Sequence, residues 1–154
     1  MTTNEADSEV YALPKWWCEH NVQLLDVYSC AGTSVALLYR LLSQRTHDQS
    51  ISHKTMPTFA EHLAFVCKEP YTAWYVILGD DYQVGAVYLS KQREIGISIL
   101  DEFRHRGYGT QAVRLLMARH PGKFLANVNP ANAASANLFR HLGFGLIQHT
   151  YARE

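Results

Sequence analysis

A run of arginines and glycines in the second half of the chain has the residue types of a diphosphate site. The run Arg104-His105-Arg106-Gly107-Tyr108-Gly109-Thr110 lies between an apolar stretch, 95–100, and a helical pattern, 111–119. A strand that continues through such a loop into a helix leaves unpaired backbone N–H groups at the helix start, where the helix dipole adds positive charge. Glycine lets backbone approach a ligand closely, and arginine pairs with phosphate oxygens. The run therefore predicts an anion site suited to a diphosphate.

Two common phosphate-binding motifs do not match this run. Gly107-Tyr108-Gly109 lacks the third glycine and the later acidic residue of the dinucleotide fingerprint. No Gly-Lys-Ser or Gly-Lys-Thr follows, which excludes a Walker loop. The spacing Arg-x-x-Gly-x-Gly after a strand is what remains.

A second motif follows, Asn129-Pro130-Ala131-Asn132 and then the helical run to Leu138-Phe139, ending at Gly143-Phe144. With the first motif it resembles the signatures of the GCN5-related N-acetyltransferase (GNAT) superfamily, over roughly residue 24 to the C-terminus. The resemblance implies an α/β (α+β) fold with a mixed, mostly antiparallel central sheet. It implies six to seven strands, splayed at the cofactor site, and about four flanking helices. It also implies acetyl-CoA as the co-substrate, with no metal.

The chain has a pattern of elements that fits this expectation. A capping box, Thr58 with Glu61, predicts the start of the second helix. The turn Gly79-Asp80-Asp81 predicts an antiparallel hairpin. In order, we expect strand 22–28, helices 33–43 and 59–66, strands 73–78, 83–90 and 94–100, helix 109–119, strand 124–128, helix 131–142 and strand 145–151.

The resemblance assigns cofactor-binding roles by position. Backbone amides at Ile97, Ser98 and Ile99 would bind the pantetheine arm and the acetyl carbonyl. The diphosphate would lie on the loop from Arg104 to Thr110, including His105 and Tyr108, with Arg104 and Arg106 adding charge. The remaining two cofactor-binding candidates are Asn132, which also suits a plain helix N-cap, and Phe139.

The catalytic assignment centres on Glu94, because many relatives place a glutamate there that takes the amine proton through water. A structural role for Glu94, paired with Arg93 or Lys91, is the alternative. His53, His149 and Tyr151 are other candidate bases. Phe139 stands where many relatives carry a tyrosine that protonates the leaving thiolate, and phenylalanine has no proton to donate.

Two functions follow from these residues. The first is an acetyl-CoA-dependent N-acetyltransferase that moves an acetyl group directly, in a ternary complex, to a primary amine of an aminosugar-like small molecule or of a protein N-terminus. The second, motivated by Phe139, is a non-catalytic acyl-CoA-binding or sensing module. The segment 52–66 resembles ribosomal-protein alanine and aminosugar acetyltransferases. Aromatic residues that suit either an acceptor platform or the core are Trp16, Trp17, Tyr71, Trp74, Tyr75 and Tyr88.

Composition sets the remaining expectations. The 154 residues suit one domain, 21–154, after an N-terminal tail, 1–20. The formal net charge of zero gives no field for nucleic acid or an anionic membrane, and no apolar run is long enough to span one. The three widely separated cysteines and the histidine spacings predict neither a disulfide framework nor a metal site. We therefore expect a cytoplasmic protein, monomer or homodimer.

Overall fold

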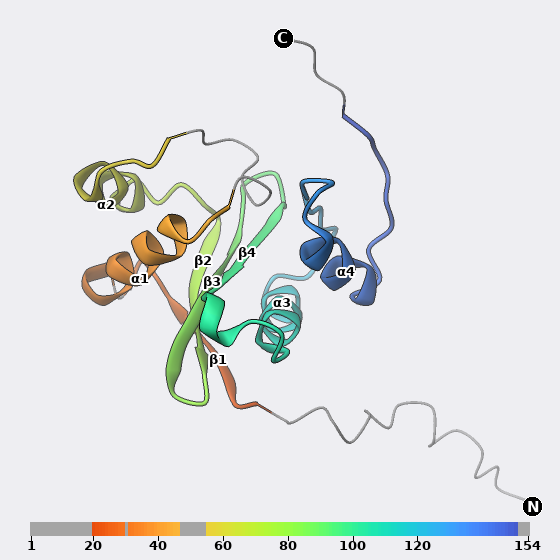
Figure 1. The fold of residues 1–154 in the computed structure, drawn as a ribbon, viewed down its shortest axis with the longest axis horizontal. Coiled ribbons are helices and arrows are strands. Elements are labelled where there is room, and N and C mark those ends of the chain that lie inside the picture. The colour runs from red at the N-terminus through yellow and green to blue at the C-terminus, as the bar shows by residue number, and fades with distance from the viewer. Residues whose placement is uncertain (1–19, 30, 47–54, 151–154) are drawn as a thin grey trace, which may run out of the picture.

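The computed structural model describes residues 20–29, 31–46 and 55–150, and these form a twisted sheet between two layers of helices (Figure 1). The sheet is antiparallel, in the order β1-β2-β3-β4. Its strands are β1 (Val22–Asp26), β2 (Ala73–Gly79), β3 (Tyr82–Leu89) and β4 (Ile95–Ile99). The expected hairpin of β2 and β3 is confirmed, and both turn residues, Asp80 and Asp81, have the positive φ angles of a tight hairpin turn.

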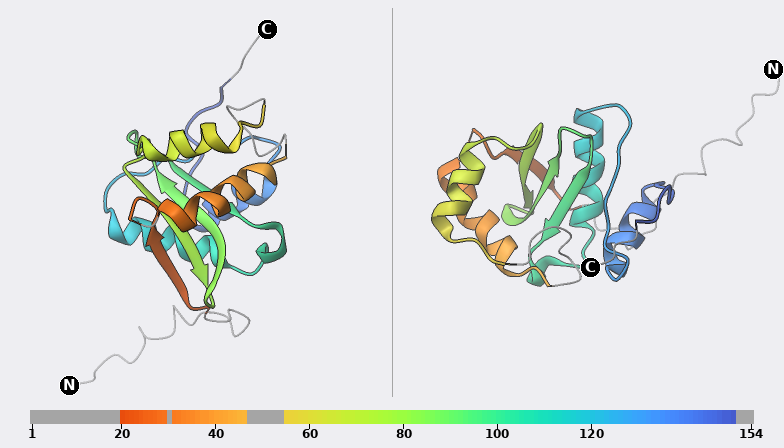
Figure 2. Two further views of the ribbon diagram at one scale, coloured as in Figure 1. Left: turned by 90° about the vertical axis from the view of Figure 1, so that its left-hand side faces the viewer. Right: turned by 90° about the horizontal axis from the view of Figure 1, so that it is seen from above.

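Helices cover both faces of the sheet, as the two turned views show (Figure 2). One face carries α1 (Ala31–Ser43) and α2 (Phe59–Cys67). The other carries α3 (Tyr108–Arg119), with α4 (Ala133–His141) beside it at the outer edge. The predicted capping box at the start of α2 is present, because Thr58 and Glu61 bond to each other's backbone N–H groups.

Side chains alternate between the two faces along each strand and build two separate cores. Between the sheet and α1 and α2, the buried residues include Val35, Leu38, Trp74 and Val76. Between the sheet and α3 they include Ile77, Val87, Val113 and Leu116. The sheet therefore has a packed core on each face. Residues from both layers can contribute to a site at its β4 edge.

Two of the expected strands are not formed in the described part of the chain, so the described sheet has four strands rather than six or seven. The segment 124–128 makes one parallel bridge, Glu94 to Leu125, and then leaves β4. Residues 145–150 have no strand partner and run away from the sheet, with Leu146 and Ile147 78% and 77% exposed (Figure 1). Their alternation suits a strand, but a strand also needs a neighbouring backbone to pair with.

Candidate active site

The edge of β4 that faces away from β3 opens partway along its length. Leu100 N–H donates to Val84 O and Ser90 N–H donates to Glu94 O, which sets the alternation of the β3–β4 ladder. Ile97 and Ile99 consequently point their N–H groups toward the other edge. There Ile95 N–H donates to Leu125 O at 2.8 Å, whereas Ile97 and Ile99 find no backbone partner among the described residues. This is the splayed edge that the sequence predicted.

The alternation treats Ser98 differently from its two neighbours. Its N–H group faces β3 within the ladder, opposite Ala86. Its hydroxyl accepts a long hydrogen bond, 3.5 Å, from the Arg45 guanidinium. The Ser98 amide is therefore not open, in contrast to the prediction, whereas those of Ile97 and Ile99 are, and Ser98 offers its side chain to the cleft instead.

The loop from Arg104 to Thr110 presents a row of backbone amides at the start of α3. The Arg104 N–H donates to Asp101 O at 3.4 Å, and the next amide with a backbone partner is that of Gln111, which donates to Gly107 O at 3.2 Å. Within the described residues, the amides from His105 to Thr110 have no hydrogen-bond partner. Gly107 is the N-cap, with φ +86°, a conformation that favours glycine. The loop is therefore an open anion-binding helix start.

Three side chains of this loop form contacts that stabilise its conformation. Arg104 donates from Nε to Ile99 O at 3.2 Å and pairs with Asp101 at 2.8 Å. Arg106 lies over the ring of Phe103 at 5.6 Å. Tyr108 is buried, and its hydroxyl donates to Asp80 at the β2–β3 turn, 2.8 Å away. Its ring thus anchors the loop to the sheet, and only its backbone can serve the anion site.

Helix α4 closes the opposite side of the opening. Asn132 is its N-cap and accepts a hydrogen bond from Ser135 N–H at 3.1 Å, so the plain capping role exists in the structure. Phe139 is 6% exposed and packs edge-on against Phe144, with no proton to donate. Gly109 lets α3 approach α4, because a Cβ there would lie 3.1 Å from Leu138 Cδ1.

These pieces surround one cleft of about 370 Å³ between β4, the loop and α4. It brings together every cofactor-binding residue predicted from the sequence. The lining includes Ile97, Ser98, Ile99, Arg104, His105, Arg106, Gly107, Tyr108, Gly109, Thr110, Asn132 and Phe139. We call it the coenzyme cleft.

Glu94 lies at one end of this cleft and does not line it. The residue precedes β4, at the bridge to Leu125, and its carboxylate accepts a hydrogen bond of 2.8 Å from Asn127 Nδ2. Asn127 does line the cleft. Of the other predicted bases, His149 lies on the exposed segment 145–150, and His53 and Tyr151 lie outside the described residues.

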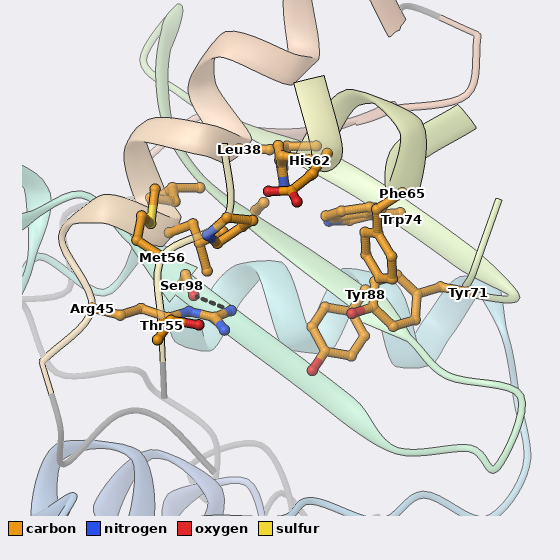
Figure 3. Close-up of a pocket in the computed structure, with 15 residues that line it drawn as sticks. Leu38, Arg45, Thr55, Met56, His62, Phe65, Tyr71, Trp74, Tyr88 and Ser98 are labelled. Carbon is orange, nitrogen blue, oxygen red and sulfur yellow. Dashed lines mark hydrogen bonds between the residues drawn. The ribbon is translucent and has the colours of Figure 1, made fainter. Parts of the chain in front are cut away.

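A second cavity, of about 410 Å³, lies on the other face of the sheet, under α1 and α2 (Figure 3). Phe65, Tyr71, Trp74 and Tyr88 gather at one end of it (Figure 3). Tyr71 and Tyr88 stack at 4.0 Å and 9°, and Phe65 and Trp74 meet Tyr71 edge-on. Arg45 and Ser98 lie at the opposite end (Figure 3). We call this the aromatic cavity.

The two cavities meet at β4. Leu41, Arg45, Tyr88 and Ser98 line both of them. Tyr88 reaches across β4 because Gly96 has no side chain, since a Cβ there would lie 2.3 Å from the Tyr88 hydroxyl. The Tyr88 hydroxyl therefore lies above β4 next to the splayed edge.

The aromatic cavity also holds a buried histidine on α2. His62 is 6% exposed, and its Nε2 has no hydrogen-bond partner in the part of the chain that the structure describes. Burial, and then the nearby Arg45 guanidinium, lower the pKa of His62 below its usual value, so the ring is neutral at neutral pH. Sequence reasoning named Tyr71, Trp74 and Tyr88 as platform or core, but it missed Arg45 and His62, which carry no local motif. Of the other aromatic candidates, Tyr75 contacts His120 on the opposite face, and Trp16 and Trp17 lie outside the described residues.

Residues 20–29, 31–46 and 55–150 hold no group of three or more histidine, cysteine, aspartate or glutamate side chains placed to bind a metal ion. In the same ranges, no helix is both long and apolar enough to cross a membrane.

Comparison with known proteins agrees with the geometry. No curated protein matches the sequence. Among solved structures, a domain from Methanocaldococcus jannaschii superposes with a TM-score of 0.69 at 19% identity, over 86% of this chain and 93% of that chain. An aminoglycoside N-acetyltransferase in complex with CoA superposes with a TM-score of 0.61 at 16% sequence identity, over 88% of this chain and 93% of that chain.

A ribosomal L7/L12 α-N-protein acetyltransferase, RimL, in complex with coenzyme A, gives a TM-score of 0.59 at 17% identity, over 78% of this chain and 77% of that chain. These likenesses confirm the predicted fold. Residues 34–145 match the acetyltransferase (GNAT) domain family. Because that match spans more than half of the sequence, the chain belongs to the GNAT family of N-acetyltransferases.

Proposed function

We propose that this protein transfers an acetyl group from acetyl-CoA to a primary amine, of a small molecule or of a protein N-terminus, directly within a ternary complex. The observation that carries the proposal is the meeting of two cavities at the splayed edge of β4. One has the open amides that a diphosphate needs, and the other leads an acceptor to the same edge. Solved neighbours with this fold include an aminoglycoside N-acetyltransferase and a protein α-N-acetyltransferase.

The residues present fit a diphosphate-bearing coenzyme. Unpaired amides at a helix N-terminus favour phosphate oxygens through both hydrogen bonds and the helix dipole. Gly107 has a left-handed backbone, and apart from its chain neighbours no described heavy atom lies within 4 Å of the place of a Cβ there, so the approach is open. When bound, acetyl-CoA supplies an acetyl thioester. Ile97 and Ile99 N–H groups are the donors available to polarise its carbonyl at the splayed edge.

The transfer requires balanced proton movements. The amine nitrogen bonds to the acetyl carbon and loses a proton, the carbon–sulfur bond breaks, and the sulfur gains a proton to give coenzyme A and the N-acetyl product. We assign the first proton to Glu94, whose carboxylate is held by Asn127. Glu94 lies two residues, about 7 Å, along the strand from Gly96, so the proton would pass through water.

The second proton needs a donor other than Phe139. Tyr88 offers one, because its hydroxyl crosses β4 above Gly96 and lines both cavities. A tyrosine hydroxyl is a general acid of ordinary strength for a thiolate leaving group. Tyr88 is thus assigned the part that the tyrosine at the place of Phe139 plays in many relatives.

The direct test is an assay of thiol release from acetyl-CoA in the presence of a panel of primary amines, with the acetylated product identified by mass spectrometry. Coenzyme A binding by calorimetry and amine-dependent turnover are the expected results. Tyr88→Phe keeps the ring and is expected to lower kcat about 10- to 100-fold while leaving coenzyme affinity unchanged. Tight binding of acetyl-CoA without turnover on any amine would instead favour a sensing module.

A further inference from the structure

The aromatic cavity has two chemically different ends. The stacked pair Tyr71 and Tyr88, with Trp74 and Phe65 edge-on, forms an apolar wall at one end. Arg45 and Ser98 lie at the other end, where the cavity meets the coenzyme cleft (Figure 3). Two hydrogen bonds with the Tyr28 hydroxyl, of 3.1 and 3.2 Å, fix the backbone of Tyr71. The wall is therefore rigid, which suits a flat or bulky apolar group.

The charges in the cavity disfavour a polycation. Among the described residues, Glu61 is the one carboxylate that lines the cavity, and its Oε2 already accepts hydrogen bonds from the N–H and hydroxyl of Thr58, at 2.7 and 2.9 Å. The cavity also holds the Arg45 guanidinium and a neutral imidazole, His62. A polyamine or an aminoglycoside would have to bury several ammonium groups here without paired carboxylates, which costs free energy.

Two groups in the cavity call for a partner. Among residues 20–29, 31–46 and 55–150, the Arg45 guanidinium has one hydrogen bond, the long one to Ser98, and pairs with no carboxylate. In the same ranges the buried His62 Nε2 has no hydrogen-bond partner, which is uncommon for a polar atom in a folded protein. An anionic group of a ligand could pair with the Arg45 guanidinium, and a polar atom of the same ligand could form a hydrogen bond with His62 Nε2.

We propose that the acceptor is a free aromatic or bulky apolar α-amino acid, acetylated on its α-amine. Its side chain would lie against the aromatic wall, its carboxylate would pair with Arg45, and its amine would face β4 at Ser98. The stacked tyrosines leave no slot between them for a nucleobase, since their rings are already 4.0 Å apart. This inference rests on the proposed function and narrows it to one class of small molecule.

The same surroundings help the chemistry. An ammonium group that enters an apolar cavity beside a guanidinium has its pKa lowered, because both desolvation and like charge disfavour the charged form. The α-amine would thus reach the splayed edge as a neutral nucleophile, and Glu94 would still take the proton that the nitrogen loses as the amide forms. The bond changes are those of the proposed transfer, with the α-nitrogen as the attacking atom.

A matched set of acceptors tests the proposal. Phenylalanine and phenethylamine share ring and amine but differ in the carboxylate, and alanine keeps the carboxylate without the ring. We expect kcat/KM for phenylalanine to exceed that for each of the other two by about tenfold or more, the scale of one charge-assisted hydrogen bond or one well-buried side chain. Spermidine, glucosamine and a peptide with N-terminal alanine complete the panel and are expected to be poor acceptors.

Two variants locate the preference, each with a control on the same helical layer. Arg45→Gln should bring the phenylalanine-to-phenethylamine ratio close to one, whereas Arg40→Gln should not, because Arg40 pairs with Glu102 outside both cavities. Phe65→Ala should lower the phenylalanine-to-alanine ratio several-fold. Phe59→Ala is its control, since both rings are about half exposed on α2 and only Phe65 lines the cavity.

The outcomes separate this inference from the proposed function. Turnover of spermidine, glucosamine or the peptide above phenylalanine would overturn the acceptor class while leaving the acetyltransferase intact. Arg45→Gln that weakens coenzyme A binding in calorimetry and leaves the acceptor ratio unchanged would place Arg45 at the coenzyme, and would also overturn the assignment. No acetylation of any amine would refute the proposed function itself.

Discussion

The two cavities that meet at β4 offer different kinds of polar group. The coenzyme cleft offers backbone amides, those of Ile97, Ile99 and the loop after Arg104, which have no backbone partner among the described residues. The aromatic cavity is built of side chains that come from α1, α2, β2, β3 and β4. A backbone site needs glycine and a strand-loop-helix order at fixed spacing. A side-chain site needs only that distant residues point to one place.

This difference explains why one site can be predicted from the sequence and the other cannot. If it is correct, changes to backbone conformation will harm the coenzyme cleft most, and changes to single side chains will tune the aromatic cavity. The predictions below test that division, beginning with the largest expected effect.

Replacing Gly107 with valine should abolish coenzyme A binding. The φ of +86° is left-handed, and a β-branched residue there is strained by about 1–2 kcal/mol or turns the loop. A turned loop loses several amide–phosphate bonds, and losing two at about 1.5 kcal/mol each weakens affinity by at least about 100-fold. Calorimetry with coenzyme A measures this. Gly143→Val is the control, because Gly143 has φ +84° but lines neither cavity.

Equal losses in the two valine variants would mean that general strain, rather than the loop's amides, sets the affinity. A folded Gly107→Val protein with normal affinity would remove the diphosphate from this loop.

Glu94→Gln should lower kcat by about 10²–10⁴-fold with little change in coenzyme affinity. Glutamine keeps an oxygen that can accept from Asn127, so the local structure is preserved while the base is lost. Glu102→Gln, which alters an exposed carboxylate paired with Arg40, serves as the control. Normal turnover of Glu94→Gln between about pH 6 and 9 would move the base to His53, His149 or Tyr151, or to an amine that arrives deprotonated.

The residues predicted to bind the coenzyme lie together in the structure because most of them are contiguous in the sequence. The capping box at Thr58 and the hairpin turn at Asp80 and Asp81 lie outside the coenzyme cleft, and they could be predicted because each follows from local conformational rules. The cleft gathers the residues of both motifs. Which amides open at β4 could not be predicted, because it depends on where the segment after Leu125 leaves the sheet.

The aromatic cavity lay beyond prediction for a different reason. Arg45 follows the end of α1 and His62 lies within α2, and only the packing of α1 and α2 on the sheet brings them together. No sequence motif marks Gly96 either, yet Tyr88 can cross β4 only because Gly96 has no side chain. The strands expected at 124–128 and 145–151 failed similarly, since pairing is a tertiary property.

Arg104→Ala should weaken coenzyme A binding by about 10- to 100-fold, the scale of a hydrogen bond to a charged group. Part of this loss would come from the loop, because Arg104 also bonds to Ile99 O and Asp101. Affinity for pantetheine, which lacks the phosphates, separates the two causes. A loss of affinity confined to coenzyme A would place the guanidinium at the phosphates. An equal loss of affinity for both ligands would mean that Arg104 acts by holding β4 and the loop in place. Arg106→Ala, which frees only a contact with Phe103, should cost less.

The smallest expected effect is a pH dependence of stability from the aromatic cavity. Burial and Arg45 hold the pKa of His62 below the value of 6.5 that it takes when unfolded. Between these two pKa values the unfolded chain binds the extra proton, so the free energy of unfolding falls as pH drops below about 6.5 and is level above it. In His62→Gln this contribution disappears. Urea unfolding of both proteins should therefore show a constant difference in the free energy of unfolding above about pH 7. Below about pH 6 the His62→Gln variant should become more stable relative to the unmodified protein. A difference that stays constant down to about pH 5 would show that His62 can be protonated in place, by water or by a partner in the cavity.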